Sequence, residues 1–161
     1  MGLAIEYKNV HTLKKLNKVI QQSTFSSNFV SLFMGEIEKN GHLFYVNAGH
    51  PAPILVSGEQ VTDLGPTGIV LGFLNDIELH RSHIYLDPGS TLVLYTDGLF
   101  ERQDTSEDQF GENRLKELVI ENQNLEAKEI VDLILKSAFE FGNSKNWEDD
   151  VTLVVIKRNK I

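Results

Sequence analysis

Tight turns between short apolar segments constrain this fold more than any other feature of the sequence. The dipeptide Asn40-Gly41 separates two segments, residues 29–38 and 42–47, that are rich in β-branched and aromatic side chains. An Asn-Gly pair between two such segments is a strong β-hairpin signal. Strands joined by so short a turn run antiparallel, because a parallel pair needs a crossover of a dozen or more residues. The sequence therefore predicts a series of antiparallel strands.

The rest of the chain continues this pattern and then adds helices. Further strands are expected at residues 54–57, 60–64, 77–86 and 91–96, with turns at Gly58 and at Asp87-Pro88-Gly89. Helices are expected at 10–22, 113–120 and 125–141, with Asn124 as the N-cap of the last helix and Gly142 as its stop. Residues 151–156 are apolar on both faces, which predicts a central strand rather than a solvated edge. The predicted fold class is α+β: an antiparallel β-sandwich, with two sheets face to face and helices outside.

Composition limits the functions that such a domain can have. The 161 residues fit one domain spanning 1–161, and the net charge of −8 argues against nucleic-acid binding, which depends on Lys and Arg neutralising phosphates. The absence of cysteine excludes a thiolate nucleophile and any zinc site built on sulfur. Because no apolar run approaches the ~18 residues of a membrane span, we expect a cytoplasmic domain that makes no membrane contact of its own.

Two acidic motifs are the best candidates for chemistry. Asp97 follows an apolar strand directly and is followed by Gly98, and Asp149-Asp150 precedes the last strand. If these two strands are antiparallel neighbours, Asp97 and Asp149 lie side by side. Two adjacent carboxylates repel, and a hard divalent cation such as Mg²⁺ or Mn²⁺ removes that repulsion. The alternative is that these are ordinary acidic strand ends and that Asp-Gly is simply a turn.

The segment Asn47-Ala48-Gly49-His50-Pro51 leaves another expected strand in a rigid turn. His50 is a candidate general acid or metal ligand, because imidazole changes its charge near neutral pH. The competing interpretation is that His50 only orients the turn through a hydrogen bond.

Taken in order, five motifs resemble the PPM-type metal-dependent serine/threonine protein phosphatases, in particular their bacterial RsbU/SpoIIE branch. The resemblance covers residues 29 to 157. It is carried by NAGHPAPIL, GIVLG, LYTDGLFE, QFGENRL and DDVTLVV. It implies that Asp97 and Asp149 are ligands of a two-ion Mn²⁺ or Mg²⁺ centre, and that the nucleophile is a metal-activated water rather than a side chain. Gly98, Asp150, Asn47, Gly49 and His50 are then supporting residues.

The family's opening segment has no counterpart in this sequence. In the family, that segment carries another metal-binding Asp and a DxxGHG-like motif, whereas the only Asp-Gly pair here is Asp97-Gly98. Two explanations stay open: the sequence is a piece of a longer domain, or the natural protein has lost half of the metal site. Either way, we expect this chain alone to bind metal weakly or not at all and to be inactive or weakly active. An uncovered sheet edge is also expected, and with it self-association.

The resemblance also implies partners. The expected substrate is a phosphoserine or phosphothreonine on a protein, of the kind found on anti-sigma-factor antagonists, in a bacterial signalling pathway that regulates sigma factors. A sensor or receiver domain is expected upstream. The alternatives are a catalytically incomplete phosphatase-like interaction module and a structural homologue with no function in its cleft.

Overall fold

The computed structural model describes residues 2–23, 29–142 and 144–160. These residues form two compact units, the first from 1–52 and 65–85 and the second from 53–64 and 86–161. The expectation of one domain over the whole chain stays a prediction. In the described residues, no helix is both long enough and apolar enough to cross a membrane.

The first unit is a three-stranded antiparallel sheet with one long helix. Strands β1 (Leu32–Ile37), β2 (His42–Ala48) and β5 (Ser82–Tyr85) lie in the order β1-β2-β5. The register of β1 and β2 pairs Leu32 with Ala48 and Ile37 with Leu43, so the chain turns at Asn40-Gly41 as predicted. Gly41 has a φ of 98°, which only glycine adopts readily.

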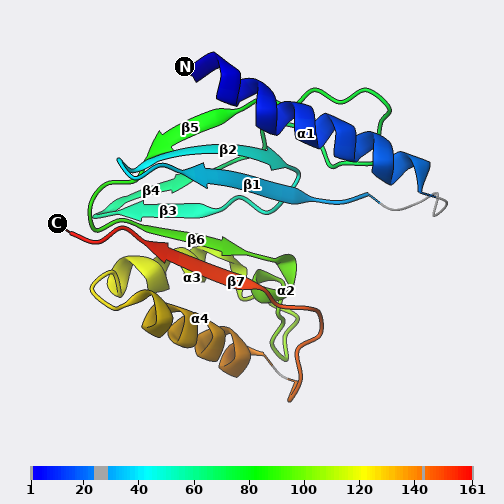
Figure 1. The fold of residues 1–161 in the computed structure, drawn as a ribbon. Coiled ribbons are helices and arrows are strands. Elements are labelled where there is room, and N and C mark those ends of the chain that lie inside the picture. The colour runs from blue at the N-terminus through cyan, green and yellow to red at the C-terminus, as the bar shows by residue number, and fades with distance from the viewer. Residues whose placement is uncertain (1, 24–28, 143, 161) are drawn as a thin grey trace. The chain divides into compact units, whose positions relative to one another are not determined.

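Helix α1 (Gly2–Gln22) lies across one face of this sheet (Figure 1). Its Leu13 is buried against Val46 and Ala48 of β2, and against Leu71. Asn17 is also buried, at 1% exposure, and its side chain joins the helix to the loop at residues 72–75. Its Nδ2 donates to the carbonyls of Leu74 (2.9 Å) and Asn75 (3.2 Å), and its Oδ1 accepts from the Gly72 amide (2.7 Å).

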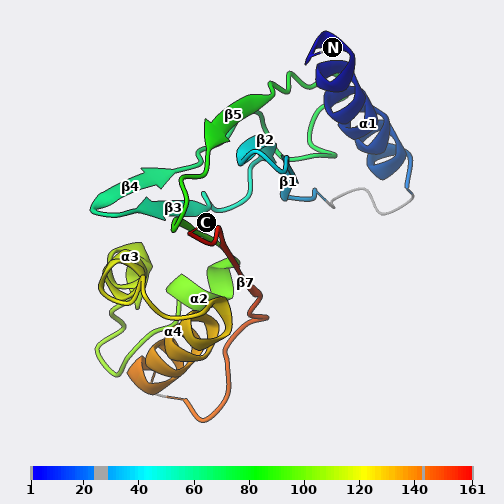
Figure 2. The ribbon, with the colours of Figure 1, turned by 60° about the vertical axis from the view of Figure 1, so that its left-hand side comes forward.

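The second unit is a four-stranded antiparallel sheet with three helices. Strands β3 (Ile54–Ser57), β4 (Gln60–Asp63), β6 (Thr91–Tyr95) and β7 (Leu153–Lys157) lie in the order β4-β3-β6-β7. Helices α2 (Asp97–Phe100), α3 (Gly111–Glu121) and α4 (Ala127–Phe141) lie on one side of this sheet (Figures 1 and 2). The core between sheet and helices contains Ile54, Val56, Val93, Tyr95, Leu99, Phe110, Leu115, Val119, Ile130, Ile134 and Ala138.

The fold confirms the antiparallel α+β class, while several boundaries differ from the predicted ones. Helix α1 begins at Gly2 rather than at residue 10, and the segment expected as a strand over 77–86 is regular only in β5. Helix α4 is capped not by Asn124 but by Glu126, which forms a capping box with Glu129. The predicted stop at Gly142 is confirmed.

The position of β7 is the main correction. The sequence predicts a central strand there, but β7 is the last strand of its sheet, with β6 on one side and no further strand among residues 2–23, 29–142 and 144–160 on the other. Leu153 and Val155 pack on the helical core, whereas Val154 is 44% exposed. The packing of Leu153 and Val155 on the helical core explains why that face of the strand is apolar.

Candidate metal centre

The ends of β6 and β7 bring the two acidic motifs together. The strands pair antiparallel as far as Tyr95 and Leu153, and the Thr96 amide donates to the Thr152 carbonyl at 3.1 Å. The end of the strand before Asp97 therefore lies beside the start of the strand after Asp149. The predicted neighbourhood of these two strands is confirmed.

Gly98 brings the two segments into direct contact. A Cβ added at Gly98 would lie 2.6 Å from the Asp150 carbonyl oxygen and 3.3 Å from the Asp149 Cβ. The first distance is too short for any real Cβ, so only glycine allows this approach. Asp149 thus packs against the residue that directly follows Asp97.

Both carboxylates are exposed and retain oxygen lone pairs for a ligand. Asp97 Oδ1 accepts a hydrogen bond from the Gly98 amide at 3.0 Å, and Asp149 Oδ1 accepts one from the Asp150 amide at 2.7 Å. Within the described part of the chain, neither carboxylate forms an ion pair. Asp149 and Asp150 also line an open hollow of about 510 Å³, together with Leu135, Trp147, Glu148 and Val151.

The donor set fits part of the coordination shell of a hard divalent cation. Carboxylate oxygens are the ligands that Mg²⁺ and Mn²⁺ prefer, and Mg²⁺ is often held by only one or two carboxylates plus water and substrate oxygens. Residues 2–23, 29–142 and 144–160 contain no group of three or more acidic or histidine side chains that could hold a metal. Asp97 and Asp149 could therefore supply two ligands, with the others coming from elsewhere.

Thr96, which the sequence analysis did not single out, joins the two segments of the candidate site. Its hydroxyl donates to the Asp150 carbonyl at 3.2 Å and accepts from the Thr152 amide at 2.9 Å. One side chain thus holds the chain on both sides of Val151. The TDG motif contains this threonine, but its partners lie more than 50 residues away, so no local pattern shows the contact.

Tyr95 lies one residue earlier and is almost fully buried, at 1% exposure. Its hydroxyl donates to Glu112 Oε1 at 3.1 Å. Burial, and then the negative charge of Glu112, raise the pKa of the Tyr95 phenol well above its ordinary value. The phenol therefore stays protonated and anchors the end of β6 to helix α3.

The Asn47–Pro51 turn belongs to the first unit and is held by its own hydrogen bonds. Asn47 Oδ1 accepts from the His50 amide at 2.9 Å, and His50 Nδ1 lies 2.9 Å from the Pro51 carbonyl. Gly49 has a φ of 73°, and a Cβ there would lie 2.4 Å from Val70 Cγ1. These contacts support the interpretation of His50 as a residue that orients the turn. The supporting role of the three residues at the site stays a prediction.

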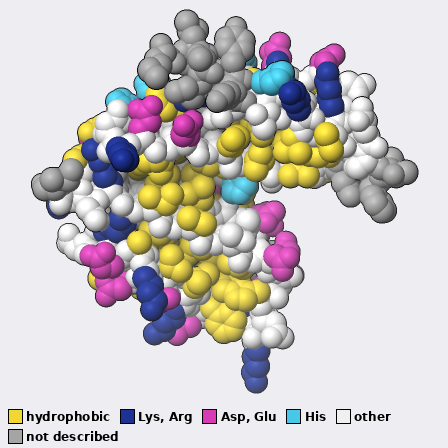
Figure 3. Space-filling view, viewed as in Figure 1, with side chains coloured by type: hydrophobic (Ala, Val, Ile, Leu, Met, Phe, Trp, Pro, Cys, Tyr) yellow, Lys and Arg dark blue, Asp and Glu magenta, His cyan; other side chains and the backbone are white. Residues whose placement is uncertain are grey.

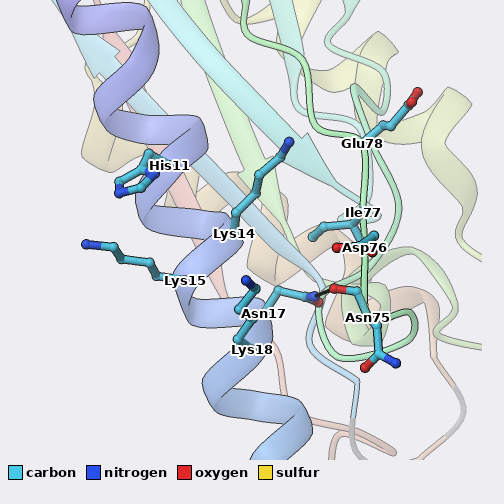
Figure 4. Close-up of a pocket in the computed structure, with 9 residues that line it drawn as sticks. All are labelled: His11, Lys14, Lys15, Asn17, Lys18, Asn75, Asp76, Ile77 and Glu78. Carbon is cyan, nitrogen blue, oxygen red and sulfur yellow. Dashed lines mark hydrogen bonds between the residues drawn. The ribbon is translucent and has the colours of Figure 1, made fainter.

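A second hollow, of about 430 Å³, lies in the first unit between α1 and the loop at residues 75–78 (Figure 4). The lysines of α1 line it from one side, and Asp76 and Glu78 line it from the other. Because positive and negative side chains both line it, the hollow has no preference for anionic over cationic ligands.

Comparison with known proteins identifies the family. The model of the family "Stage II sporulation protein E (SpoIIE)" matches residues 4–159. The chain therefore belongs to the SpoIIE family, which confirms its resemblance to the RsbU/SpoIIE branch of the PPM-type phosphatases.

Among curated proteins, the chain is 32% identical over 150 residues to the phosphoserine phosphatase RsbU of Bacillus subtilis, covering 91% of this chain and 44% of that protein. It is 31% identical over 133 residues to the protein IcfG of Synechocystis, covering 81% of this chain and 21% of that protein. The chain thus spans less than half the length of these two relatives.

Solved structures show the same fold. The SiaA-PP2C domain of Pseudomonas aeruginosa superposes with a TM-score of 0.80 at 16% identity, covering 92% of this chain and 60% of that one. The PP2C phosphatase domain of SpoIIE from Bacillus subtilis, with a fragment of its regulatory domain, gives 0.76 at 20% identity and covers 94% and 44%. These likenesses confirm the predicted fold class.

Proposed function

We propose that this chain is the part of a phosphoserine/phosphothreonine protein phosphatase domain that supplies Asp97 and Asp149 to a Mn²⁺ or Mg²⁺ centre. The observation that carries the proposal is that Asp97 and Asp149 lie at adjoining strand ends, with Gly98 packed against Asp149, in a chain that belongs to the SpoIIE family. Further ligands would come from water, substrate oxygens or chain outside residues 1–161.

In such a site, each residue of this chain has a distinct role. The divalent ions, when bound, supply the Lewis acidity that activates water and offsets charge on the phosphoryl group. Asp97 and Asp149 would hold them through carboxylate oxygens, and Gly98 lets the two segments approach. No side chain of this domain is needed as a nucleophile.

The finer assignments are part of the proposal. We place the domain in the cytoplasm, in a signalling pathway that regulates sigma factors. Its substrate there is a phosphorylated protein of the anti-sigma-factor antagonist kind. A sensor or receiver domain precedes it. The support is the likeness to RsbU and to a structure of RsbU and RsbW domains from Mycobacterium tuberculosis, at 24% identity and a TM-score of 0.71.

The test is hydrolysis of an aryl phosphate by the protein at its full natural length, with and without Mn²⁺. Asp97→Asn removes a charged ligand and is expected to lower the Mn²⁺-dependent rate by roughly a hundredfold or more. Asp132→Asn is the matched control, because Asp132 is exposed on α4 and does not line the hollow at Asp149 and Asp150, so this variant should keep the wild-type rate.

The competing function is a phosphatase-like interaction module. The observation that favours it is that the described residues hold no cluster of three metal ligands. If the full-length protein shows no Mn²⁺-dependent hydrolysis but still binds its phosphoprotein, the module is the correct function.

A further inference from the structure

Arg102 is a fully buried charged residue in the second unit, and its side-chain hydrogen bonds all lead to the end of α4 and the segment that follows it. Its side chain has 0% exposure, and its guanidinium reaches across to the end of α4 and to the residues that precede Asp149. A charge of this kind is costly to bury unless it is paired and hydrogen-bonded. Its partners therefore show what it holds in place.

Four hydrogen bonds join the Arg102 side chain to the last turn of α4 and to the chain between α4 and β7. Nη2 donates to the carbonyls of Phe139 (3.2 Å) and Ser144 (2.7 Å). Nη1 donates to the Asn146 carbonyl (2.9 Å) and to Glu148 Oε2 (2.5 Å). The cation also offsets the negative end of the α4 dipole, since Phe139 lies in the last turn of that helix.

The surroundings of the guanidinium fix its place. Its Cζ lies 4.8 Å from the centre of the Trp147 ring and 4.9 Å from that of Phe139, both within the range of cation–π contact. A Cβ at Gly142 would lie 2.0 Å from Arg102 Nε, so any other residue at position 142 would displace the side chain. The guanidinium thus has one position, which four acceptors, two rings and one glycine define.

One short element, consisting of helix α2 and its flanking residues 96 and 101–102, carries both Asp97 and Arg102. Helix α2 begins at Asp97 and ends at Phe100, two residues before Arg102. The segment 144–150 is therefore bound to this element at both ends: by Arg102 at Ser144, Asn146 and Glu148, and by Gly98 and the Thr96 hydroxyl at Asp149 and Asp150. Glu148 directly precedes Asp149.

We propose that Arg102 is a positioning residue that sets the place of Asp149 relative to Asp97. The inference rests on the proposed metal role of these two carboxylates. A Lys at position 102 keeps the charge but cannot bridge the same acceptors, because the planar fork of five N–H donors belongs to Arg alone. Loss of the fork frees segment 144–150 while β6 and β7 stay paired.

Hydrogen–deuterium exchange of this chain tests the contact without any metal. In Arg102→Lys, backbone amides of residues 144–152 are expected to exchange at least tenfold faster, while those of residues 130–138 in α4 change by less than about threefold. Glu148→Gln, which alters an exposed partner and leaves the fold intact, should give a smaller change in the same segment. Equal acceleration in both regions would show that Arg102 only stabilises the core, and unchanged exchange at 144–152 would also overturn the proposal.

Mn²⁺ titration tests the link to the site. Paramagnetic broadening of the Gly98 and Asp150 amide NMR signals detects even weak binding, and Arg102→Lys should require about ten- to a hundredfold more Mn²⁺ for the same broadening, as for other residues that orient metal ligands. Equal Mn²⁺ requirements in variant and wild type would exclude the positioning role.

Arg114→Lys is the matched control for both measurements. Arg114 lies 4.6 Å from the Phe141 ring and donates to the carbonyls of Gln109 and Phe110, but it binds nothing in segment 144–150. Its variant should behave as wild type. If the wild-type signals of Gly98 and Asp150 do not broaden at all, the metal assignment fails, and the exchange experiment then decides the role of Arg102 alone.

Discussion

At the scale of single residues, the ionisation of Tyr95 should make the free energy of unfolding depend on pH in alkaline solution. Its buried phenol has a raised pKa, whereas in the unfolded chain the phenol ionises near the ordinary tyrosine pKa of about 10. Above that pH the unfolded state binds fewer protons than the folded state, so the free energy of unfolding falls as pH rises. Tyr95→Phe removes this contribution, and its unfolding free energy should fall less steeply above pH 10 in urea titrations.

Glu112→Gln separates the two causes of the raised pKa. Because burial is the larger cause, this variant should keep most of the wild-type steepness although the charge beside the phenol is gone. Identical slopes in wild type and Tyr95→Phe would show that the phenol ionises as readily in the folded protein as in the unfolded one.

The residues that sequence can predict are those whose role shows in their own neighbourhood. Asp97 and Asp149 follow or precede apolar strands, so their place at strand ends could be derived from the pattern, and their adjacency needed only one assumption about pairing. Thr96 and Arg102 could not be found in this way. Their partners lie tens of residues away, and a buried Arg looks in sequence like any surface charge.

At the scale of elements, the close approach of α2 to the segment before β7 depends on the absence of a side chain at Gly98. The Cβ of Ala at this position would lie 2.6 Å from a backbone oxygen, which cannot rotate away as a side chain can. We expect Gly98→Ala to lower the free energy of unfolding by about 1–3 kcal/mol, as overpacking does, and to weaken Mn²⁺ binding. Chemical denaturation and the NMR titration measure the two effects.

Gly65→Ala is the control for this substitution. A Cβ at Gly65 would meet nothing within 4 Å, and its backbone is not in the left-handed region, so stability should change by less than about 0.5 kcal/mol. Wild-type stability and Mn²⁺ affinity in Gly98→Ala would mean that the two segments do not need their close approach.

Elements were predictable where their signals are local. The β1–β2 hairpin follows from Asn40-Gly41, and the end of α4 follows from Gly142. Helix α2 was missed because four residues are too short to show a helical period. The prediction of a central position for β7 was wrong. Apolar side chains indicate that a strand is buried but not what buries it, and here Leu153 and Val155 are covered by helices and not by another strand.

At the scale of the whole molecule, strand order depends on contacts between distant segments and lies beyond what turns and periodicity can show. The antiparallel class followed from the short connections, because these forbid crossovers. The order β4-β3-β6-β7 required the pairing of β6 with β7 across more than 50 residues. Family resemblance supplied what pattern alone could not, namely the proposal that these two strand ends carry metal ligands.

The free edge of β7 predicts that this chain self-associates. Among residues 2–23, 29–142 and 144–160, no strand pairs with its outer side, and Val154 of this strand is 44% exposed. Hydrophobic side chains gather over β7 and the neighbouring α4 (Figure 3). An unpaired apolar edge is a template for another strand, so a second copy of the chain is expected to pair with it. Sedimentation velocity over a range of protein concentrations should show a monomer that converts to a larger species.

Val154→Lys tests whether β7 is the surface responsible. Lysine on an edge strand opposes pairing, because a second chain would have to bury its charge, so this variant should shift the association to several-fold higher protein concentration. Val19→Lys is the matched control, since Val19 is 62% exposed on α1 and lies in the other unit. A wild-type chain that stays monomeric at every concentration would refute the prediction. Equal association of Val154→Lys and wild type would place the contact elsewhere than on β7.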